Sequence, residues 1–87
     1  IAGKINQIRE SKLGGMGHAG ELETSIMEYL DYKKVKQANK RDQTVQGHPI
    51  YNPDMFAKNP VYIYRSFKDY SDIGVIGDST LASAEKG

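Results

Sequence analysis

The chain has 87 residues, a length that suits one small domain and is short for a complete enzyme. Its formal net charge of +1 creates no strong field toward nucleic acid or an anionic membrane, so we expect neither as a partner. The absence of cysteine excludes disulfides, a zinc ribbon and a thiol nucleophile, and is compatible with the cytoplasmic location that we expect. No run of roughly 18 apolar residues predicts a membrane span.

The first predicted elements are a short helix and a glycine-rich loop. Ile1, Ile5 and Ile8 recur at helical spacing and predict an amphipathic helix within residues 1–12. Residues 13–20, LGGMGHAG, contain four glycines. We interpret this segment as a loop without regular structure, whose backbone can approach a ligand closely.

The clearest helical pattern starts near Glu21. Polar residues such as Glu28 and Asp31 fall largely on one face of this helix. The opposite face, which we expect to be buried, carries Leu22, Ile26, Tyr29 and Leu30. The helix begins either at Gly20 or at Ser25, because Ser25 and Glu28 also fit the S-x-x-E pattern of a capping box.

The middle of the chain is predicted to be a long loop followed by a strand. Residues 36–60 are polar and carry all three prolines, which indicates a loop with one helical turn near residues 54–57. A loop of this length in a small domain is usually functional. Residues 61–67, VYIYRSF, are rich in β-branched and aromatic side chains and predict a strand.

The last segment is predicted to turn and then to start a helix. Residues 69–80 contain two glycines and are interpreted as a turn. A final helix is expected to begin near Leu81. Asp78 or Ser79 would serve as its N-cap, because both side chains can accept a hydrogen bond from the first turn.

His18 lies in the glycine-rich loop, close in sequence to Glu21 and Glu23. If the helix begins at Gly20, the unpaired N–H groups of its first turn point toward this histidine, which suits an oxyanion or a proton-transfer site. The simpler alternative is a histidine beside a helix start whose acids complement the helix dipole. H-x-x-E is too short a pattern to predict a metal site.

Two separate segments resemble one family. HAGELETSIM, residues 18–27, is similar to the H-A-G-x-x-E-T-S signature of the creatininase (creatinine amidohydrolase) family. GVIGDSTLASAEKG, residues 74–87, resembles the later G-D-P-x-x-A-T-A-E-K-G segment of that family. Two signatures in the right order are more specific than either alone, and the resemblance spans roughly residues 13–87.

The resemblance implies an α/β fold, as part of a three-layer α/β/α creatininase-like domain with a mainly parallel sheet. It also implies a centre of two divalent metal ions (zinc, manganese or iron), hydrolysis of an amide-type C–N bond and assembly into a homohexamer. The family's metal ligands precede the H-A-G signature and have no counterpart here. We therefore expect residues 1–87 to be the C-terminal portion of a single domain, with the ligands on a missing N-terminal portion, possibly a second chain.

The resemblance also assigns roles to the glycine-rich loop. His18 matches the histidine that transfers a proton to the leaving nitrogen, and Glu23 matches a glutamate that orients the site, so both are candidate catalytic residues. Gly15, Met16, Gly17 and His18 are the expected contacts to a small, cyclic substrate. Creatininase itself has glutamate at the position of Gly17, which weakens the expectation that creatinine is the substrate.

The implied chemistry is attack of a metal-bound hydroxide on a carbonyl, followed by protonation of the departing nitrogen by His18. Two alternatives remain at this stage. The chain could be a noncatalytic scaffold or interface subunit of a creatininase-like assembly. It could also belong to a hydrolase of the same family that acts on another ring bond.

Overall fold

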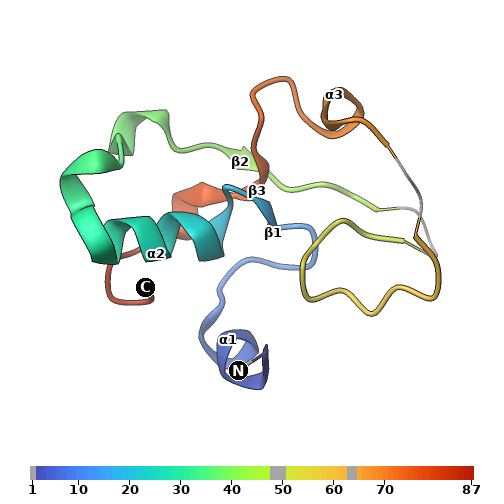
Figure 1. Cartoon of the computed structure of the whole chain (residues 1–87), viewed down its shortest axis with the longest axis horizontal. Coiled ribbons are helices and arrows are strands. Elements are labelled where there is room, and N and C mark those ends of the chain that lie inside the picture. The colour runs from blue at the N-terminus through green and yellow to red at the C-terminus, as the bar shows by residue number, and fades with distance from the viewer. Residues whose placement is uncertain (1, 48–50, 63–64) are drawn as a thin grey trace.

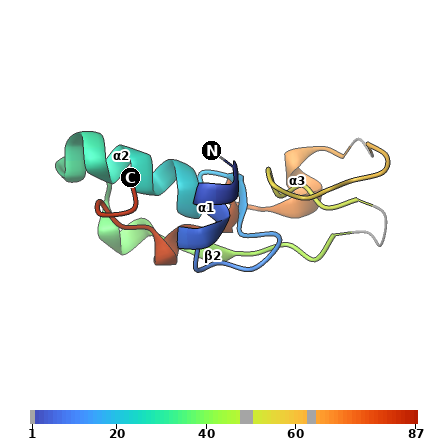
Figure 2. The same cartoon turned by 90° about the horizontal axis from the view of Figure 1, so that it is seen from below.

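The computed structural model describes residues 2–47, 51–62 and 65–87 (Figure 1). The helices and strands follow one another in the order α1 (Ala2–Ile8), β1 (Met16–His18), α2 (Glu21–Asp31), β2 (Asp42–Gln43), α3 (Phe67–Tyr70) and β3 (Ile76–Asp78). Short 3-10 turns are η1 (Tyr32–Lys34), η2 (Gln37–Asn39) and η3 (Ser79–Leu81). The molecule is flat, with Cα extents of 37 × 30 × 15 Å (Figure 2). No helix of the described ranges is long and apolar enough to cross a membrane.

The three strands form one antiparallel sheet in the order β1-β3-β2. Met16 pairs with Gly77 on one side of β3, and Asp42 pairs with Asp78 on the other. Because β1 and β2 both run opposite to β3, they run in the same direction, and α2 lies in the crossover that joins them. The prediction of a mainly parallel sheet is wrong for these three strands. β3, the last strand of the chain, lies between β1 and β2, so both pairings are antiparallel. The three-layer arrangement is likewise not confirmed.

All three strands lie where none was predicted. β2 lies within residues 36–60, the predicted long loop, whereas β1 occupies part of the glycine-rich loop and β3 occupies the segment interpreted as a turn. Their close approach requires glycine, because Gly77 has a φ of +145° and a Cβ there would lie 2.4 Å from the carbonyl oxygen of Gly15. Local propensity misjudged both segments because pairing between distant residues forms these strands.

The strand predicted for residues 61–67 is absent from the described part of that segment. Residues 61, 62, 65 and 66 are irregular and Phe67 begins α3, whereas residues 63–64 lie outside the described ranges. The expected turn at residues 54–57 is confirmed by a hydrogen bond from the Ala57 N–H to the Asp54 carbonyl (3.1 Å). The predicted N-terminal helix is confirmed in part, as α1, although Ile1 lies outside the described residues.

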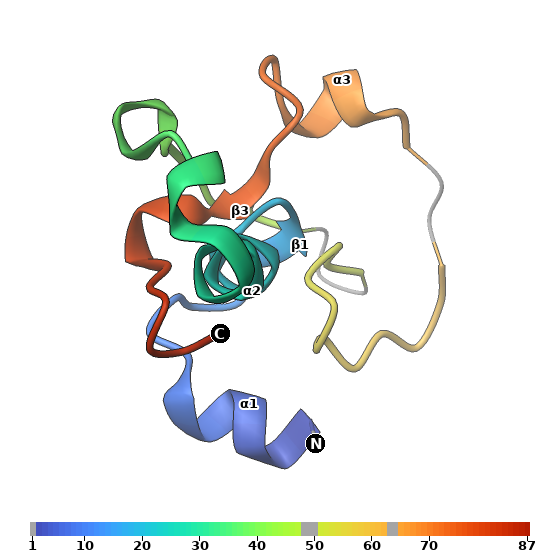
Figure 3. The same cartoon turned by 60° about the vertical axis from the view of Figure 1, so that its left-hand side comes forward.

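The final helix differs in position and type from its prediction. Asp78 is the N-cap, because its carboxylate accepts a hydrogen bond from the Thr80 N–H (2.9 Å). The helix begins at Ser79 rather than near Leu81, and it is a single 3-10 turn that ends at Leu81. The segment that follows returns to α2 (Figures 1 and 3), where the Ser25 hydroxyl accepts a hydrogen bond from the Ser83 N–H (3.1 Å).

α2 begins after Gly20, so the alternative start at Ser25 is wrong. The expected orientation of the helix is also wrong, because its buried residues are Glu21, Ser25 and Glu28. Its apolar face is exposed instead, with exposed fractions of 43% for Ile26, 46% for Met27, 67% for Tyr29 and 69% for Leu30. The polar face turns inward because lysines from other segments meet it: Lys86 lies 2.9 Å from Glu21 and Lys40 lies 2.7 Å from Glu28.

The interior is held together largely by buried carboxylates, since its buried apolar residues among those described are Met16, Ile76 and Ala82. Glu21 is 1% exposed and accepts hydrogen bonds from two backbone N–H groups, from the Ser11 hydroxyl (2.7 Å) and from Lys86. Burial alone would raise the pKa of Glu21, but these donors outweigh it and lower the pKa from 4.5 to about 2.

Asp54 is a second buried carboxylate that holds the glycine-rich segment in place. Its carboxylate pairs with Arg9 (2.8 Å) and accepts hydrogen bonds from the N–H groups of Gly14 (2.9 Å) and Met16 (3.1 Å). Burial opposes ionisation here too, but the Arg9 guanidinium and the backbone donors hold the pKa of Asp54 below its usual range. The segment that leads to His18 is therefore anchored by a charge rather than by apolar packing.

The lowered pKa of Glu21 predicts a loss of stability in acid. The ionised side chain stabilises the fold above pH 4.5, and that contribution, roughly 3 kcal/mol, is lost as the pH falls from 4.5 toward 2. Glu21→Gln should lower the free energy of unfolding at pH 7 and flatten its dependence on pH in urea titrations. Glu85→Gln, on an exposed neighbour of Lys86, should leave the acid transition of the wild type in place. An unchanged acid transition in Glu21→Gln would contradict this role.

The inverted helix makes a second prediction. Leu30→Lys should change the free energy of unfolding of the chain alone by no more than about 0.5 kcal/mol, because Leu30 is 69% exposed. Ser25→Lys should cost more than about 2 kcal/mol, because Ser25 is 2% exposed and lysine would bury an unpaired charge. Urea denaturation measures both, and a greater loss from Leu30→Lys would show that the apolar face is packed.

Candidate functional site

The turn between β1 and α2 carries His18 and is held by side chains of the following helix. Ala19 has a φ of +52°, a conformation that costs a non-glycine residue about 1 kcal/mol. The Glu23 carboxylate accepts a hydrogen bond from the Ala19 N–H (2.7 Å), and the Thr24 hydroxyl donates one to the Ala19 carbonyl (3.1 Å). Glu23 and Thr24 therefore stabilise the strained residue next to the imidazole.

The structure brings the two predicted catalytic side chains together. Nδ1 of His18 lies 4.0 Å from a carboxylate oxygen of Glu23, with exposed side-chain fractions of 51% and 47%. At this separation the two side chains share no hydrogen bond, and the closer contact of Glu23 is with the backbone of Ala19. Glu23 thus fixes the turn directly and places a negative charge near the imidazole.

His18 lies at the wall of a cavity of about 200 Å³, which is smaller than the clefts that bind drug-sized ligands. Strands β1 and β3 contribute Gly17, His18 and Ile76 to this wall. The remaining lining residues are mostly aromatic: Tyr51, Pro53, Tyr62, Arg65, Phe67 and Tyr70. The imidazole and the Phe67 ring lie 5.1 Å apart, centroid to centroid, at a tilt of 57°. We call this space the His18 cavity.

The aromatic rings of the His18 cavity contact one another. The rings of Tyr51 and Tyr62 are 5.5 Å apart in an edge-to-face arrangement. Burial raises the pKa of Tyr51, and the neighbouring Tyr62 and Tyr70 raise it further. The Tyr51 hydroxyl therefore stays protonated at neutral pH and can donate a hydrogen bond into the cavity.

The four residues expected to contact substrate do not all line this cavity. Gly17 and His18 do. Met16 is 2% exposed, and its N–H and carbonyl are both used, by Asp54 and by the Met55 N–H. The Gly15 carbonyl accepts hydrogen bonds from two backbone N–H groups, so it serves to join β1 to α2 and β3.

Local sequence patterns did not indicate most of the aromatic wall. The signal was present in the composition, because six of the eight aromatic residues fall between residues 51 and 70. These aromatic residues are spread through segments that were predicted to be a loop and a strand, so their spacing did not indicate a shared cavity wall. Only the folded chain places four of these rings at the cavity that His18 lines, although His18 lies more than thirty positions earlier in the sequence.

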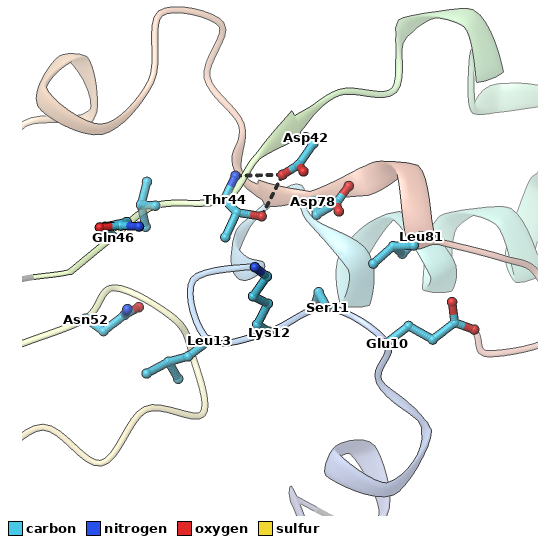
Figure 4. A pocket seen from close by; sticks show the side chains of 11 residues that line it. Glu10, Ser11, Lys12, Leu13, Asp42, Thr44, Gln46, Asn52, Asp78 and Leu81 are labelled. Carbon is cyan, nitrogen blue, oxygen red and sulfur yellow. Dashed lines mark hydrogen bonds between the residues drawn. The ribbon is translucent and has the colours of Figure 1, made fainter.

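A larger cavity of about 490 Å³ lies on the other side of β3, between β2 and the segment that follows α1 (Figure 4). Asp42 and Asp78 border it, and Lys12 extends toward Asp42 and Thr44. The Thr44 hydroxyl (2.6 Å) and N–H (3.0 Å) hold the pKa of Asp42 below its usual range, with a further contribution from Lys12. Each of these carboxylates accepts a hydrogen bond from the N–H group two residues later, so both already have a structural role. The His18 cavity is therefore the stronger candidate for a functional site.

The residues present do not fit a two-metal centre. Among the described residues, no group of three or more His, Cys, Asp or Glu side chains could hold a metal ion. Near His18, Glu23 supplies a carboxylate only at 4.0 Å from the imidazole, whereas a bound ion needs at least three protein donors that converge on one point.

Comparison with known proteins points to one family. A family model described as "Creatininase: Creatinine amidohydrolase" matches residues 2–87. No curated protein and no solved structure matches the chain.

Because Gly17 is closely packed, we expect that adding a methyl group at this position destabilises the fold. A Cβ at Gly17 would lie 2.5 Å from Cγ2 and 2.7 Å from the carbonyl oxygen of Ile76, so β1 and β3 would have to separate at the cavity wall. Gly17→Ala should therefore cost about 1–3 kcal/mol of unfolding free energy in urea denaturation. Gly3→Ala, where a Cβ meets nothing within 4 Å, is the matched control and should not destabilise the chain.

Proposed function

Because this chain belongs to the creatininase family, we propose that it hydrolyses an amide-type C–N bond in a small, cyclic substrate bound in the His18 cavity. The observation that carries the proposal is the position of the family's signature histidine, at the wall of a cavity of about 200 Å³ with a carboxylate beside it. Hydrolysis adds the hydroxyl of water to the carbonyl carbon and a proton to the nitrogen that leaves.

His18 is the group that we assign to that proton. An amide nitrogen leaves as an amine only after protonation, and an imidazole can supply a proton near neutral pH. About half of the His18 side chain is exposed, and His18 lines the cavity, so a bound substrate can reach it. Glu23 is a positioning residue, because it holds the N–H of Ala19 and thereby the turn that presents the imidazole.

The two metal ions implied by the resemblance would supply the activated water and polarise the carbonyl. We propose that their ligands belong to polypeptide outside the described residues, either on the N-terminal portion of the same domain or on a second chain. The exposed apolar face of α2, Ile26, Met27, Tyr29 and Leu30, supports this proposal because an uncovered face of this size is typical of an interface. A three-layer domain and a homohexamer are the arrangements that we expect to cover it.

The same exposed face is the specific observation that favours a second candidate, a noncatalytic interface subunit. Such a subunit would need the outer face of α2 but would not need an imidazole at the cavity wall. Substitutions at His18 therefore distinguish the two candidates. They should lower the turnover of a hydrolase, whereas they should leave the assembly formed by an interface subunit unchanged.

His18→Ala should lower kcat for a cyclic amide about 10²–10⁴-fold in the complete, metal-loaded protein, because the leaving nitrogen loses its proton donor. The loss should be smaller for the corresponding lactone, whose leaving oxygen depends less on protonation. Glu23→Gln should lower kcat less than His18→Ala, because it keeps the imidazole in place. Steady-state kinetics measure all three, with circular dichroism as the check on folding. Full turnover by His18→Ala with both metals bound would remove His18 from the mechanism.

A further inference from the structure

We propose that the substrate of the His18 cavity carries a carboxylate, which Arg65 binds while the planar ring of the substrate packs among the aromatic side chains. This inference rests on the proposed function for the cyclic amide and adds the substituent that the cavity selects. Three features support it: the guanidinium of Arg65, which makes no ion pair with the described residues, the uncovered aromatic rings, and the positive charge among the described residues that line the cavity.

Arg65 differs from the other two arginines of the chain in what its guanidinium contacts. Arg9 pairs with Asp54 (2.8 Å), and Arg41 donates hydrogen bonds to the carbonyls of Ala38 and Lys40 (2.8 Å each). Within residues 2–47, 51–62 and 65–87, Arg65 makes no ion pair, and it lines the His18 cavity. A planar guanidinium with free N–H donors matches a carboxylate in a two-pronged hydrogen bond.

The aromatic side chains of the cavity provide the complementary apolar surface. Tyr62 is 73% exposed and Phe67 is 52% exposed, so both rings can bury further area against a ligand. Planar rings pack favourably against aromatic rings in offset or edge-to-face geometry. Phe67 already lies 5.1 Å from the imidazole of His18, so a ring held against it would lie next to the assigned proton donor.

The charge of the lining residues favours an anion over a cation, which is the main alternative ligand for four aromatic rings. Among the described lining residues Arg65 alone carries a permanent charge, and it is positive. A substrate cation would be repelled by Arg65, whereas a carboxylate would be attracted. A ring with an acidic substituent therefore satisfies both the aromatic and the charged parts of the wall.

The test compares pyroglutamate with pyrrolidinone, two five-membered cyclic amides that differ in the carboxylate. Each is titrated into the full chain in its native assembly, with the imidazole resonances of His18 as the NMR readout of binding. Pyroglutamate should bind at least about tenfold more tightly than pyrrolidinone, as expected for hydrogen bonds to a charged group. Arg65→Gln should remove this difference and leave the affinity for pyrrolidinone unchanged.

Lys68→Gln is the matched control, because it removes one positive charge from exposed α3, near Arg65 in the sequence, at a residue that does not line the cavity. It should keep the tenfold preference. The inference is overturned if both probes bind equally, if neither binds, or if Lys68→Gln removes the preference as completely as Arg65→Gln. Binding is measured without turnover, so a preference that depends on Arg65 in a protein that hydrolyses no cyclic amide would refute the proposed function alone. Hydrolysis without the preference would refute this inference alone.

Discussion

The buried carboxylate of Glu21 is the interaction on which the rest of the structure depends. It joins the segment after α1, the first turn of α2 and Lys86 near the end of the chain, so three distant parts of the sequence meet at one side chain. Its position in the first turn of α2 also suits the positive end of the helix dipole. Because α2 follows directly on the turn that carries His18, the same carboxylate sets the position of the candidate site.

This use of charge explains why α2 faces the opposite way from its hydrophobic pattern. Glu21 and Glu28 have lysine partners within 3 Å, and a buried carboxylate without a partner would cost far more than an exposed leucine. The outward apolar face is the consequence, and it supports the proposal that another layer of polypeptide covers α2. The flat shape, 15 Å in its shortest extent, agrees with this proposal, since it leaves the outer face of α2 at the surface.

The candidate site combines evidence of two kinds. Family membership supplies the reaction class, and the geometry supplies the surroundings in which His18 would act. The aromatic wall and Arg65 come from a segment that carries neither family signature, so they are suited to decide which substrate is bound rather than which bond is broken. A division between the residue that we assign to proton transfer and the wall that we propose selects the substrate is typical of sites built on loops.

The amino-acid sequence by itself identified the family, through two short signatures, and brought His18 close to Glu23, five positions away. It narrowed the start of α2 to Gly20 or Ser25 and the last N-cap to Asp78 or Ser79, because each of these features depends on a few neighbouring residues. The tertiary structure alone decided the antiparallel sheet, the inward face of α2 and the aromatic wall. These three depend on contacts between residues from 12 positions apart, as for Glu28 with Lys40, to 65 positions apart, as for Glu21 with Lys86, whose free energy outweighs local propensity and hydrophobic periodicity. Local patterns report what a segment can form, whereas its partners across the chain determine which face and which pairing it adopts.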